Sequence, residues 1–351
     1  MSTSVTIKDI AKVAGCSTAT VHRALYGKKG LGKETREKIL TICAAKGYKT
    51  NTSASLLKRK KLNIVVAFPG LTEENKYFYQ QIWTGFRAWK SENSGYPLSI
   101  EELSYYFDSQ NSQAKVLRDA LNLHHGDIDG LITVGHFDAE AKNVIERYKR
   151  EGVSIFLVND DYPLSGRVAC VQTDFTMVGE MVGELLSSQL AKKSQILLLT
   201  GDPLIPSHYE TVQGFVSYME KNSPSLRIIK LGGYLDETLL SQQMSRILQG
   251  NTEIKAVFGI CARITVLMAE IIEKLGIAEN LRAIGSDVFD ESLKLLDTGI
   301  LKNLVFKNPQ MQSYKTANLM FRYLAMGEKP IEDNIYVHSH LVFKSEVHSY
   351  Q

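Results

Sequence analysis

The 351-residue chain has few cysteines and no long apolar run, and these absences exclude several classes of protein. The cysteines are Cys16, Cys43, Cys170 and Cys261. None has the paired spacing of a zinc site or a redox motif, so we interpret all four as reduced, small apolar residues. No apolar run approaches the roughly 18–20 residues that span a bilayer. Charged Lys8, Asp9 and Lys12 interrupt the N-terminus, where a secretory signal needs an apolar stretch. We therefore expect a cytoplasmic protein.

Motifs that carry catalysis are also missing. The chain has no Gly-x-Ser-x-Gly elbow, no His-Glu-x-x-His pair and no Walker phosphate loop. We interpret His124, His125, His338 and His340 as solvent-facing residues rather than metal ligands. The sequence predicts no enzyme activity, no metal and no cofactor. A ligand cleft in the body of the chain would still be compatible with a sugar-processing or hydrolase-type enzyme.

A formal net charge of only +3 conceals a strong charge asymmetry. Residues 1–61 hold fourteen lysines and arginines against three acids, a net charge of +11, whereas residues 62–351 carry −8. A basic head on an acidic body is typical of a nucleic-acid-binding module joined to a second domain. A basic run alone, such as residues 58–61, would indicate only a solvated surface. The sequence just upstream decides in favour of DNA.

Residues 6–25 have the pattern of two short helices joined by a tight turn. Thr6 can cap the first helix, with Asp9 three residues later, and Ser17 can cap the second. Gly15 can supply the turn between them. The apolar positions at helical spacing are Ile7, Ile10, Ala11, Ala14, Val21, Ala24 and Leu25. The outward positions of the second helix are Thr18, Ala19, His22 and Arg23. This pattern predicts a helix-turn-helix whose second helix enters a DNA major groove.

A third helix is predicted over residues 33–46, with Leu40 and Ala44 on its inner face. A polar connector follows and contains one short helical possibility, in which Asn51 is the cap and Ala54 and Leu57 form an apolar edge. A helix of this length is not stable alone, so it needs a partner, either a second copy of itself or DNA.

Strands and helices alternate from residue 62 onward. The predicted strands are 62–68, 130–134, 154–158, 195–199, 228–231, 256–260 and 282–285, and the predicted helices are 78–91, 139–151, 211–221, 237–249 and 265–275. Such alternation predicts parallel sheets covered by helices on both faces. Two series of this kind indicate two doubly wound lobes, with a ligand in the cleft at the carboxyl ends of the strands.

The order of these motifs resembles the LacI/GalR family of bacterial regulators along the full length. Residues 6–25 are similar to the family's helix-turn-helix signature, 33–39 and 46–48 to its third helix, and 51–57 to its hinge helix. The resemblance implies an α-helical DNA-binding head and a body like periplasmic sugar-binding proteins of type I. The expected domains are 1–49 for the head, 50–61 for the hinge and 62–351 for effector binding and dimerisation. We expect lobe 1 at about 62–161 and 290–323, and lobe 2 at about 162–289 and 324–351.

The resemblance also implies which residues touch DNA. Thr18, Ala19 and Arg23 fall where the family reads bases, and Arg23 can be bidentate to a guanine. Thr20 and its neighbouring residues are expected at phosphates, and Thr6 and Ser17 are also expected to contact DNA. His22 replaces a usual small serine, so it either contacts DNA or is a surface histidine. Leu57, with Asn51 and Ala54 beside it, matches the leucine that wedges into the minor groove.

In the body, aromatic, acidic and amide residues at strand ends suit a polyol, which needs ring faces and hydroxyl acceptors. By resemblance, the effector site comprises Phe78, Tyr79, Asn159, Asp160, Asp174 and Asp287, together with His208. Thr211, Cys261 and Lys307 replace residues that are frequent in sugar-binding relatives. Lys307 indicates either an anionic or modified sugar, or only a salt bridge, and each acid could instead cap a helix.

These features predict a transcriptional regulator, most simply a repressor, whose affinity for a pseudo-palindromic operator is controlled by a small molecule. The partners expected are double-stranded operator DNA, a carbohydrate effector and a second copy of the chain. We expect a dimer rather than a zipper-linked tetramer, located at the nucleoid when it is bound to its operator. The alternatives are a sugar-processing enzyme and a sensor of a purine or another non-sugar metabolite. The sign of the effector's action stays open.

Overall fold

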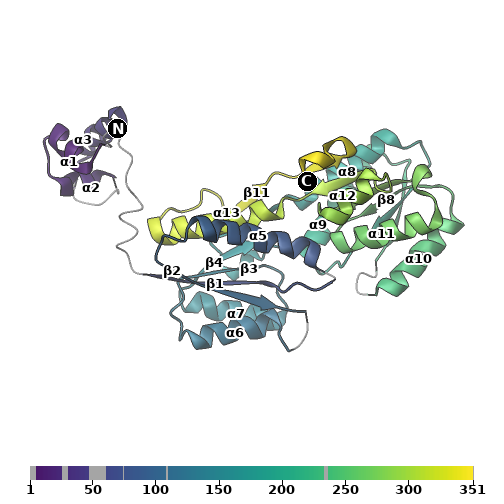
Figure 1. Cartoon of the computed structure of the whole chain (residues 1–351), viewed down its shortest axis with the longest axis horizontal. Coiled ribbons are helices and arrows are strands. Elements are labelled where there is room, and N and C mark those ends of the chain that lie inside the picture. The colour runs from purple at the N-terminus through teal and green to yellow at the C-terminus, as the bar shows by residue number, and fades with distance from the viewer. Residues whose placement is uncertain are drawn as a thin grey trace. The chain divides into compact units, whose positions relative to one another are not determined.

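The computed structural model describes residues 5–25, 31–46, 61–73, 75–107, 110–232 and 236–350. The chain divides into two compact units, Met1–Lys60 and Lys61–Gln351 (Figure 1). The hinge residues Asn51, Ala54 and Leu57 lie outside the described residues, and so does the hinge helix predicted from them.

The first unit contains the helices α1 (Ile7–Ala14), α2 (Thr18–Leu25) and α3 (Lys33–Ala45). Thr6 and Asp9 form a complete capping box at the start of α1, as predicted. Gly15 ends α1 with φ at 68°, a left-handed conformation that suits glycine because it has no Cβ. Ser17 Oγ accepts a hydrogen bond from the backbone N–H of Thr20 at 3.1 Å, which caps α2. The predicted helix-turn-helix is therefore confirmed.

A small apolar core holds these helices together. Its buried members are Ile10, Ala11, Val21, Ala24, Ile39 and Cys43. The inner face predicted for α3 was wrong by one residue, because Leu40 is 42% exposed and Ala44 is also exposed. Ile39 and Cys43 take those positions, since they are spaced by one helical turn and face Ile10 and Val21 within the same cluster.

The second unit contains two sheets. The first has the order β11-β5-β4-β3-β1-β2, and every described pairing in it is parallel. Its strands are β1 (Leu62–Pro69), β2 (Leu98–Tyr105), β3 (Gly130–Val134), β4 (Ser154–Val158), β5 (Ala169–Thr173) and β11 (Asn334–Val337). Interior strands such as β3 are buried throughout, which explains why their sequences are mostly apolar.

The second sheet has the order β12-β10-β9-β8-β6-β7. Its strands are β6 (Gln195–Leu199), β7 (Arg227–Leu231), β8 (Ile254–Gly259), β9 (Arg282–Ser286), β10 (Asn303–Phe306) and β12 (His340–Phe343). The described pairings are parallel except that of β10 with β12, which is antiparallel. Two parallel-dominated sheets agree with the predicted doubly wound fold.

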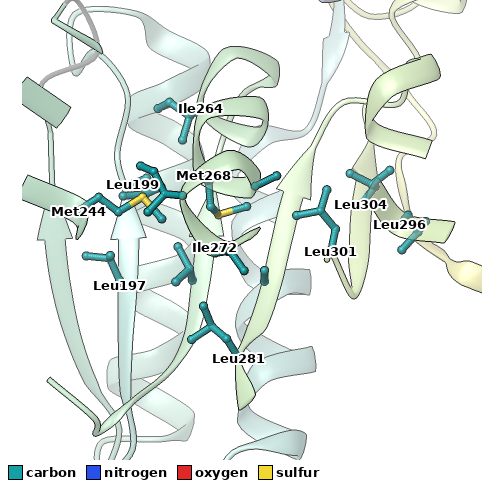
Figure 2. Packing of buried hydrophobic residues seen from close by; sticks show 14 of the residues in the cluster. Leu197, Leu199, Met244, Ile264, Met268, Ile272, Leu281, Leu296, Leu301 and Leu304 are labelled. Carbon is teal, nitrogen blue, oxygen red and sulfur yellow. The ribbon is translucent and has the colours of Figure 1, made fainter. Parts of the chain in front are cut away.

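Helices cover both faces of each sheet (Figure 1). The first sheet lies between α5 (Lys76–Glu92) with α13 (Pro309–Phe321) on one face and α6 (Gln113–Leu123) with α7 (Ala139–Arg150) on the other. The helices of the second sheet are α8 (Phe175–Gln189), α9 (Pro206–Asn222), α10 (Glu237–Gly250), α11 (Ala262–Leu275) and α12 (Asp290–Asp297). Figure 2 shows the core in which Met244 of α10 and Met268 and Ile272 of α11 meet the leucines of the second sheet.

The polypeptide crosses from one lobe to the other at different residues from those expected. β5 was expected in lobe 2 but pairs with β4 in the first sheet, and β11 joins it there. β10 and α12 were expected in lobe 1 but belong with the second sheet. Lobe 1 therefore ends its first passage at β5, and α13 and β11 return to it. Periodicity could not reveal these crossovers because they depend on pairings such as Asn334 with Cys170, which are remote in sequence.

Helices α8 and α9 pack closely against each other because glycines lie at their contact. A Cβ added to Gly214 would stand 2.1 Å from the carbonyl oxygen of Thr176, a backbone atom that cannot move aside cheaply. We expect Gly214→Ala to lower the free energy of unfolding by about 1–3 kcal/mol, measured by urea denaturation. Gly250→Ala is the matched control, because a Cβ there meets nothing within 4 Å. Equal stabilities of the two variants would contradict the close packing.

Candidate functional site

The outer face of α2 presents the residues expected to read DNA. Thr18, Ala19 and Arg23 are exposed, and Thr20 is half-buried. The Thr20 hydroxyl lies 2.9 Å from Ser17 Oγ, so the cap of α2 also orients a hydroxyl that is expected at a phosphate. His22 belongs to α2, but its side chain lies outside the described part of the structure.

Thr6 takes part in the cap of α1. Its hydroxyl donates to Asp9 Oδ2 at 2.6 Å, and its backbone N–H donates to the same oxygen at 2.8 Å. Hydrogen bonds from Thr6 hold the pKa of Asp9 below its usual value. A carboxylate at the first turn also complements the helix dipole. The contact of Thr6 with DNA stays a prediction.

A cavity of about 330 Å³ lies where strands of both sheets end. Asn159 and Asp160 follow β4, Asp287 follows β9 and Lys307 follows β10, so the two lobes supply its polar wall together. The predicted effector residues that line it are Phe78, Tyr79, Asn159, Asp160, His208, Cys261, Asp287 and Lys307. Parallel sheets place ligands at this edge because their strand ends converge there.

Asp160 links the two lobes across the cavity. It is 2% exposed, and its Oδ1 accepts the backbone N–H of Ser207 in the first turn of α9 at 2.9 Å. Its Oδ2 accepts the side-chain amide of Asn159 at 2.7 Å. Asn159 adopts φ of 68°, which turns the chain sharply at the end of β4. A lobe 1 carboxylate is therefore held at the positive end of a lobe 2 helix.

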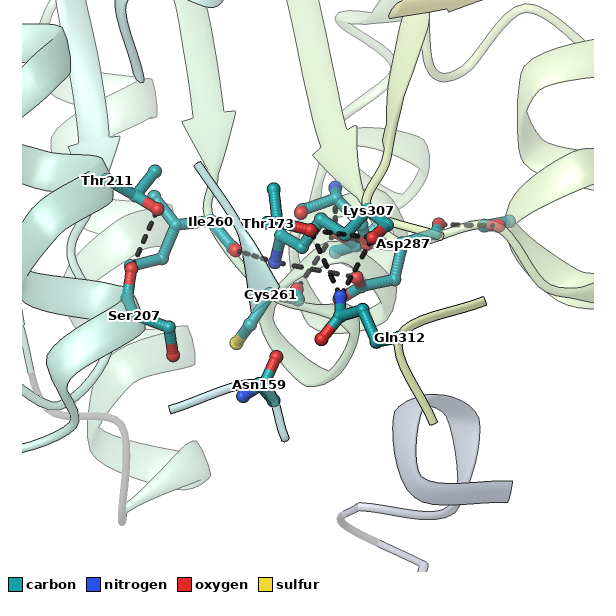
Figure 3. A network of polar contacts seen from close by, with 12 residues as sticks. Asn159, Thr173, Ser207, Thr211, Ile260, Cys261, Asp287, Lys307 and Gln312 are labelled. Carbon is teal, nitrogen blue, oxygen red and sulfur yellow. Dashed lines mark hydrogen bonds and ion pairs between the residues drawn. The ribbon is translucent and has the colours of Figure 1, made fainter. Parts of the chain in front are cut away.

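Asp287 and Lys307 form a buried ion pair on the lobe 2 side. Lys307 Nζ lies 3.4 Å from Asp287 Oδ1 and donates to the carbonyl oxygen of Ile260 at 2.9 Å. Burial raises the pKa of Asp287, and Lys307 opposes that rise. The Lys307 carbonyl oxygen accepts bonds from Thr173 Oγ1 at 2.6 Å and Gln312 Nε2 at 2.9 Å (Figure 3). The residue carrying the ion pair is thus also anchored to β5 and α13 of lobe 1.

Aromatic rings form the apolar wall. Phe78 and Tyr79 of α5 lie edge to face, with centroids 5.4 Å apart. Phe175 at the start of α8 is buried, whereas Phe107, which follows β2, is 68% exposed. Ring faces of this kind pack against C–H surfaces of a ligand.

Two side chains with catalytic potential are held in inactive protonation states. Burial lowers the pKa of His208 to about 3, and its Nδ1 accepts the backbone N–H of Asp202 at 3.1 Å. Burial raises the pKa of Cys261 to about 11. At neutral pH the imidazole is uncharged and the thiol is protonated. Neither group is prepared for acid–base or nucleophilic chemistry.

Two predicted effector residues do not line this cavity. Asp174 caps α8, accepting the backbone N–H of Met177 at 2.9 Å. Thr211 is 1% exposed, and its hydroxyl donates to the Ser207 carbonyl oxygen at 2.8 Å. The bonds that they make are those of a helix cap and of an internal turn of α9. For Asp174, this is the helix-cap role weighed from the sequence.

Sequence reasoning missed other residues of the wall. They are Asn75, Phe107, His136, Phe175, Asp202, Ile205, Ser207, Ala262 and Arg263. His136 and Asp202 closely follow β3 and β6, so the same strand-end rule could have found them. Phe107 could not have been found this way, because the strand β2 that precedes it was not predicted.

Family models match both parts of the chain. The model described as "Periplasmic binding protein domain" matches residues 65–329, and "Bacterial regulatory proteins, lacI family" matches residues 6–51. The second match covers the helix-turn-helix whose caps and core are described above. The chain belongs to the lacI family of bacterial regulatory proteins. As a member of the lacI family it is a DNA-binding transcriptional regulator, and its body is a periplasmic binding protein domain.

Curated relatives of this LacI-family chain are named as regulators. It is 23% identical over 250 residues to the HTH-type transcriptional regulator DegA of Bacillus subtilis, covering 71% of this chain and 68% of DegA. It is 29% identical over 175 residues to the HTH-type transcriptional regulator GalR of Streptococcus thermophilus, covering 48% of this chain and 46% of GalR. The GalR match therefore spans about half the length of either protein.

Solved structures share the fold of the LacI-family body. GanP, a glucose-galactose binding protein from Geobacillus stearothermophilus, has a TM-score of 0.69 at 22% identity, covering 82% of this chain and 99% of GanP. A solute-binding protein from Burkholderia graminis in complex with D-arabinose has a TM-score of 0.73 at 16% identity, covering 83% of this chain and 98% of its own. Both support the architecture of two lobes.

Neither a membrane span nor a metal site occurs in the described part of this LacI-family chain. No helix there has the length and apolar character that crossing a bilayer requires. No group of three or more histidines, cysteines and acids in those residues is arranged to hold a metal ion.

Glu210 of α9 makes the stability of this LacI-family regulator depend on pH. Burial first, and then Asp160, Asp174 and Asp161, raise its pKa from 4.5 to about 7. The folded protein keeps this proton where the unfolded chain loses it. The contribution of this proton to the free energy of unfolding is therefore fully present below about pH 4.5, and it is lost as the pH rises to about 7. We expect Glu210→Gln to be more stable than the unaltered protein at about pH 8 and equally stable at about pH 4.

Chemical denaturation at the two pH values measures this difference. Glu220→Gln is the matched control, because Glu220 lies on the same helix and is exposed. The same stability difference for Glu210→Gln at both pH values would contradict the assignment.

Proposed function

We propose that the chain is a homodimeric repressor that binds a pseudo-palindromic operator and is controlled by a carbohydrate in the cavity between its lobes. Thr18, Ala19 and Arg23 read the bases of each half-site. Two copies related by a two-fold axis place two recognition helices on two half-sites, which explains why the operator has this symmetry.

One observation carries this proposal: a chain with an exposed recognition helix also has a cavity in which two lobes combine carboxylates with aromatic rings. Asp160, Asp287 and Asn159 provide hydrogen-bond acceptors for hydroxyl groups, and Phe78 and Tyr79 provide ring faces. A cavity of about 330 Å³ is at the small end of ligand sites, which suits a ligand of about monosaccharide size. The ligand changes operator affinity if it binds one lobe arrangement better than the other.

Binding without turnover is part of the proposal. The neutral imidazole of His208, the protonated thiol of Cys261 and the ion pair of Asp287 provide no activated nucleophile or base. A sugar-processing enzyme on the same fold would convert a bound sugar to product.

The test is binding of the purified protein to a library of genomic DNA fragments, repeated with neutral, amino, acidic and phosphorylated sugars. We expect a short palindrome to be enriched, and one compound to shift its affinity by about 5–150-fold, the usual range of allosteric coupling. Uniform binding that only weakens with salt would contradict sequence-specific recognition. Chromatography of the sugars after incubation tests for turnover, and a new product would favour the enzyme.

A further inference from the structure

We propose that the carbohydrate selected by this cavity carries a primary amine, whose ammonium group binds Asp160. This inference rests on the proposed function and specifies its ligand: an amino sugar rather than a neutral, acidic or phosphorylated one. Three features of the cavity support it, namely the engagement of its cations, the environment of Asp160 and the acceptor left at Asn159.

The basic side chains of the wall are already engaged by acids. Lys307 is paired with Asp287 and bonded to the Ile260 carbonyl oxygen. Arg263 donates to Glu237 at 2.6 Å, and its side chain is 9% exposed. A phosphate or carboxylate would have to displace these carboxylates to gain a cationic partner. The cavity is therefore unfavourable to anions, and the anionic sugar that Lys307 suggested in the sequence is not the ligand proposed.

Asp160, unlike Lys307 and Arg263, has no oppositely charged partner in the described structure. Its hydrogen-bond partners in the structure, the Asn159 amide and the Ser207 N–H, carry no formal charge. Within the described residues, no lysine or arginine forms an ion pair with it, whereas neighbouring Asp161 receives Arg167 at 2.6 Å. A carboxylate that is 2% exposed is stabilised most by a cation brought into contact with it.

Other acids lie near Asp160. Glu210 lies close enough that Asp160, Asp174 and Asp161 contribute to raising its pKa, after burial. The guanidinium of Arg167 compensates Asp161 and Asp333. Glu210 keeps its proton below about pH 7, so Asp160 is left as the carboxylate that a ligand cation would compensate.

A buried acceptor completes the ammonium site. Asn159 directs its amide nitrogen to Asp160, and its Oδ1 is buried without a hydrogen-bond partner in the described structure. An unsatisfied buried acceptor is costly, so a donor that reaches it strengthens binding. An ammonium group has three donors and can serve both residues, whereas one hydroxyl has a single donor. The rings of Phe78 and Tyr79 in the same wall also favour a cation over an anion.

The test is isothermal titration calorimetry of the full chain at about pH 6.5, where an amine of the α-amino type is protonated. The probes are glucosamine, galactosamine and mannosamine, with the matching neutral hexoses, N-acetylated hexosamines and hexose 6-phosphates. We expect one amino sugar to bind at least about tenfold more tightly than its neutral and N-acetylated counterparts. The phosphates should bind most weakly.

Asp160→Asn is expected to remove most of this preference, because it keeps the shape and removes the charge. Asp297→Asn is the matched control, since Asp297 is exposed at the end of α12, and it should keep the full preference. If Asp160→Asn does not fold, as judged by circular dichroism, the titrations of the unaltered protein with the set of sugars are the test of the amine preference.

The outcomes separate this proposal from the function on which it rests. Equal or tighter binding of a neutral or phosphorylated sugar would overturn the amine and leave a carbohydrate effector in place. An amine preference unchanged in folded Asp160→Asn would overturn the assignment to Asp160. Failure of every sugar to bind would overturn both the amine and the carbohydrate effector.

Discussion

Asp287→Ala is expected to abolish the response of operator binding to the effector. The Asp287 carboxylate lines the cavity, is 5% exposed and is paired with Lys307 at 3.4 Å. Its removal takes away a ligand acceptor and leaves a buried ammonium without a counter-charge. Breaking a buried pair in this way costs about 3–5 kcal/mol of folding stability. Operator affinity should be measured with and without the compound that shifts the unaltered protein, and stability by urea denaturation.

Two further variants separate ligand binding from stability. Asp287→Ala combined with Lys307→Met removes both charges, and it should recover most of the lost stability without recovering the response. Asp297→Ala removes an exposed acid from the same lobe and should leave the response unchanged. Basal operator binding should persist in all three variants, because α1, α2 and α3 form a unit with its own core. A fully responsive Asp287→Ala protein would place the effector elsewhere.

Arg23→Ala is expected to weaken binding to the operator by about 5–150-fold, the discrimination of one bidentate arginine–guanine contact. Arg23 is exposed on the outer face of α2, and Val21 and Ala24 beside it are buried in the core of the head. The variant should therefore fold normally and lose preference at one base pair. Fluorescence anisotropy with the operator and with each single-base-pair substitution measures both effects.

Lys38→Ala is the control for the loss of one positive charge, because Lys38 is exposed on α3. It should weaken specific and nonspecific DNA equally, if it has any effect, and leave base preference unchanged. If Arg23→Ala also weakens both kinds of DNA equally, Arg23 contacts only phosphate.

Part of the secondary structure was predictable from local signals, whereas α6, α8, α13 and β5 were not predicted. The strands at 130–134, 154–158 and 195–199 were predicted with the bounds that the structure has, because each is a short apolar run with polar residues or turns beside it. The caps at Thr6 and Ser17 were also predictable, since each depends on residues only three positions apart. β2 was not found, because its residues are mostly half-buried and include two acids in succession, Glu101 and Glu102.

The candidate site was predictable in part for a similar reason. Residues that directly follow a strand, such as Asn159 and Asp287, line the cavity, and this position can be inferred from the chain order. Asp174 also follows a strand, yet it caps α8 and does not line the cavity. A strand end and a helix start look alike in sequence when one residue serves as both.

The sequence by itself determined the two-part organisation of this protein: a basic helix-turn-helix joined to an acidic body of two α/β lobes. These features follow from charge, helical caps and apolar periodicity, all of which act over a few residues. Only the tertiary structure decided which strands belong to each lobe, that Lys307 is engaged by Asp287, and that Asp160 meets the first turn of α9. Such contacts join residues 20 to 164 positions apart, and long-range pairing and burial select them after the local elements have formed.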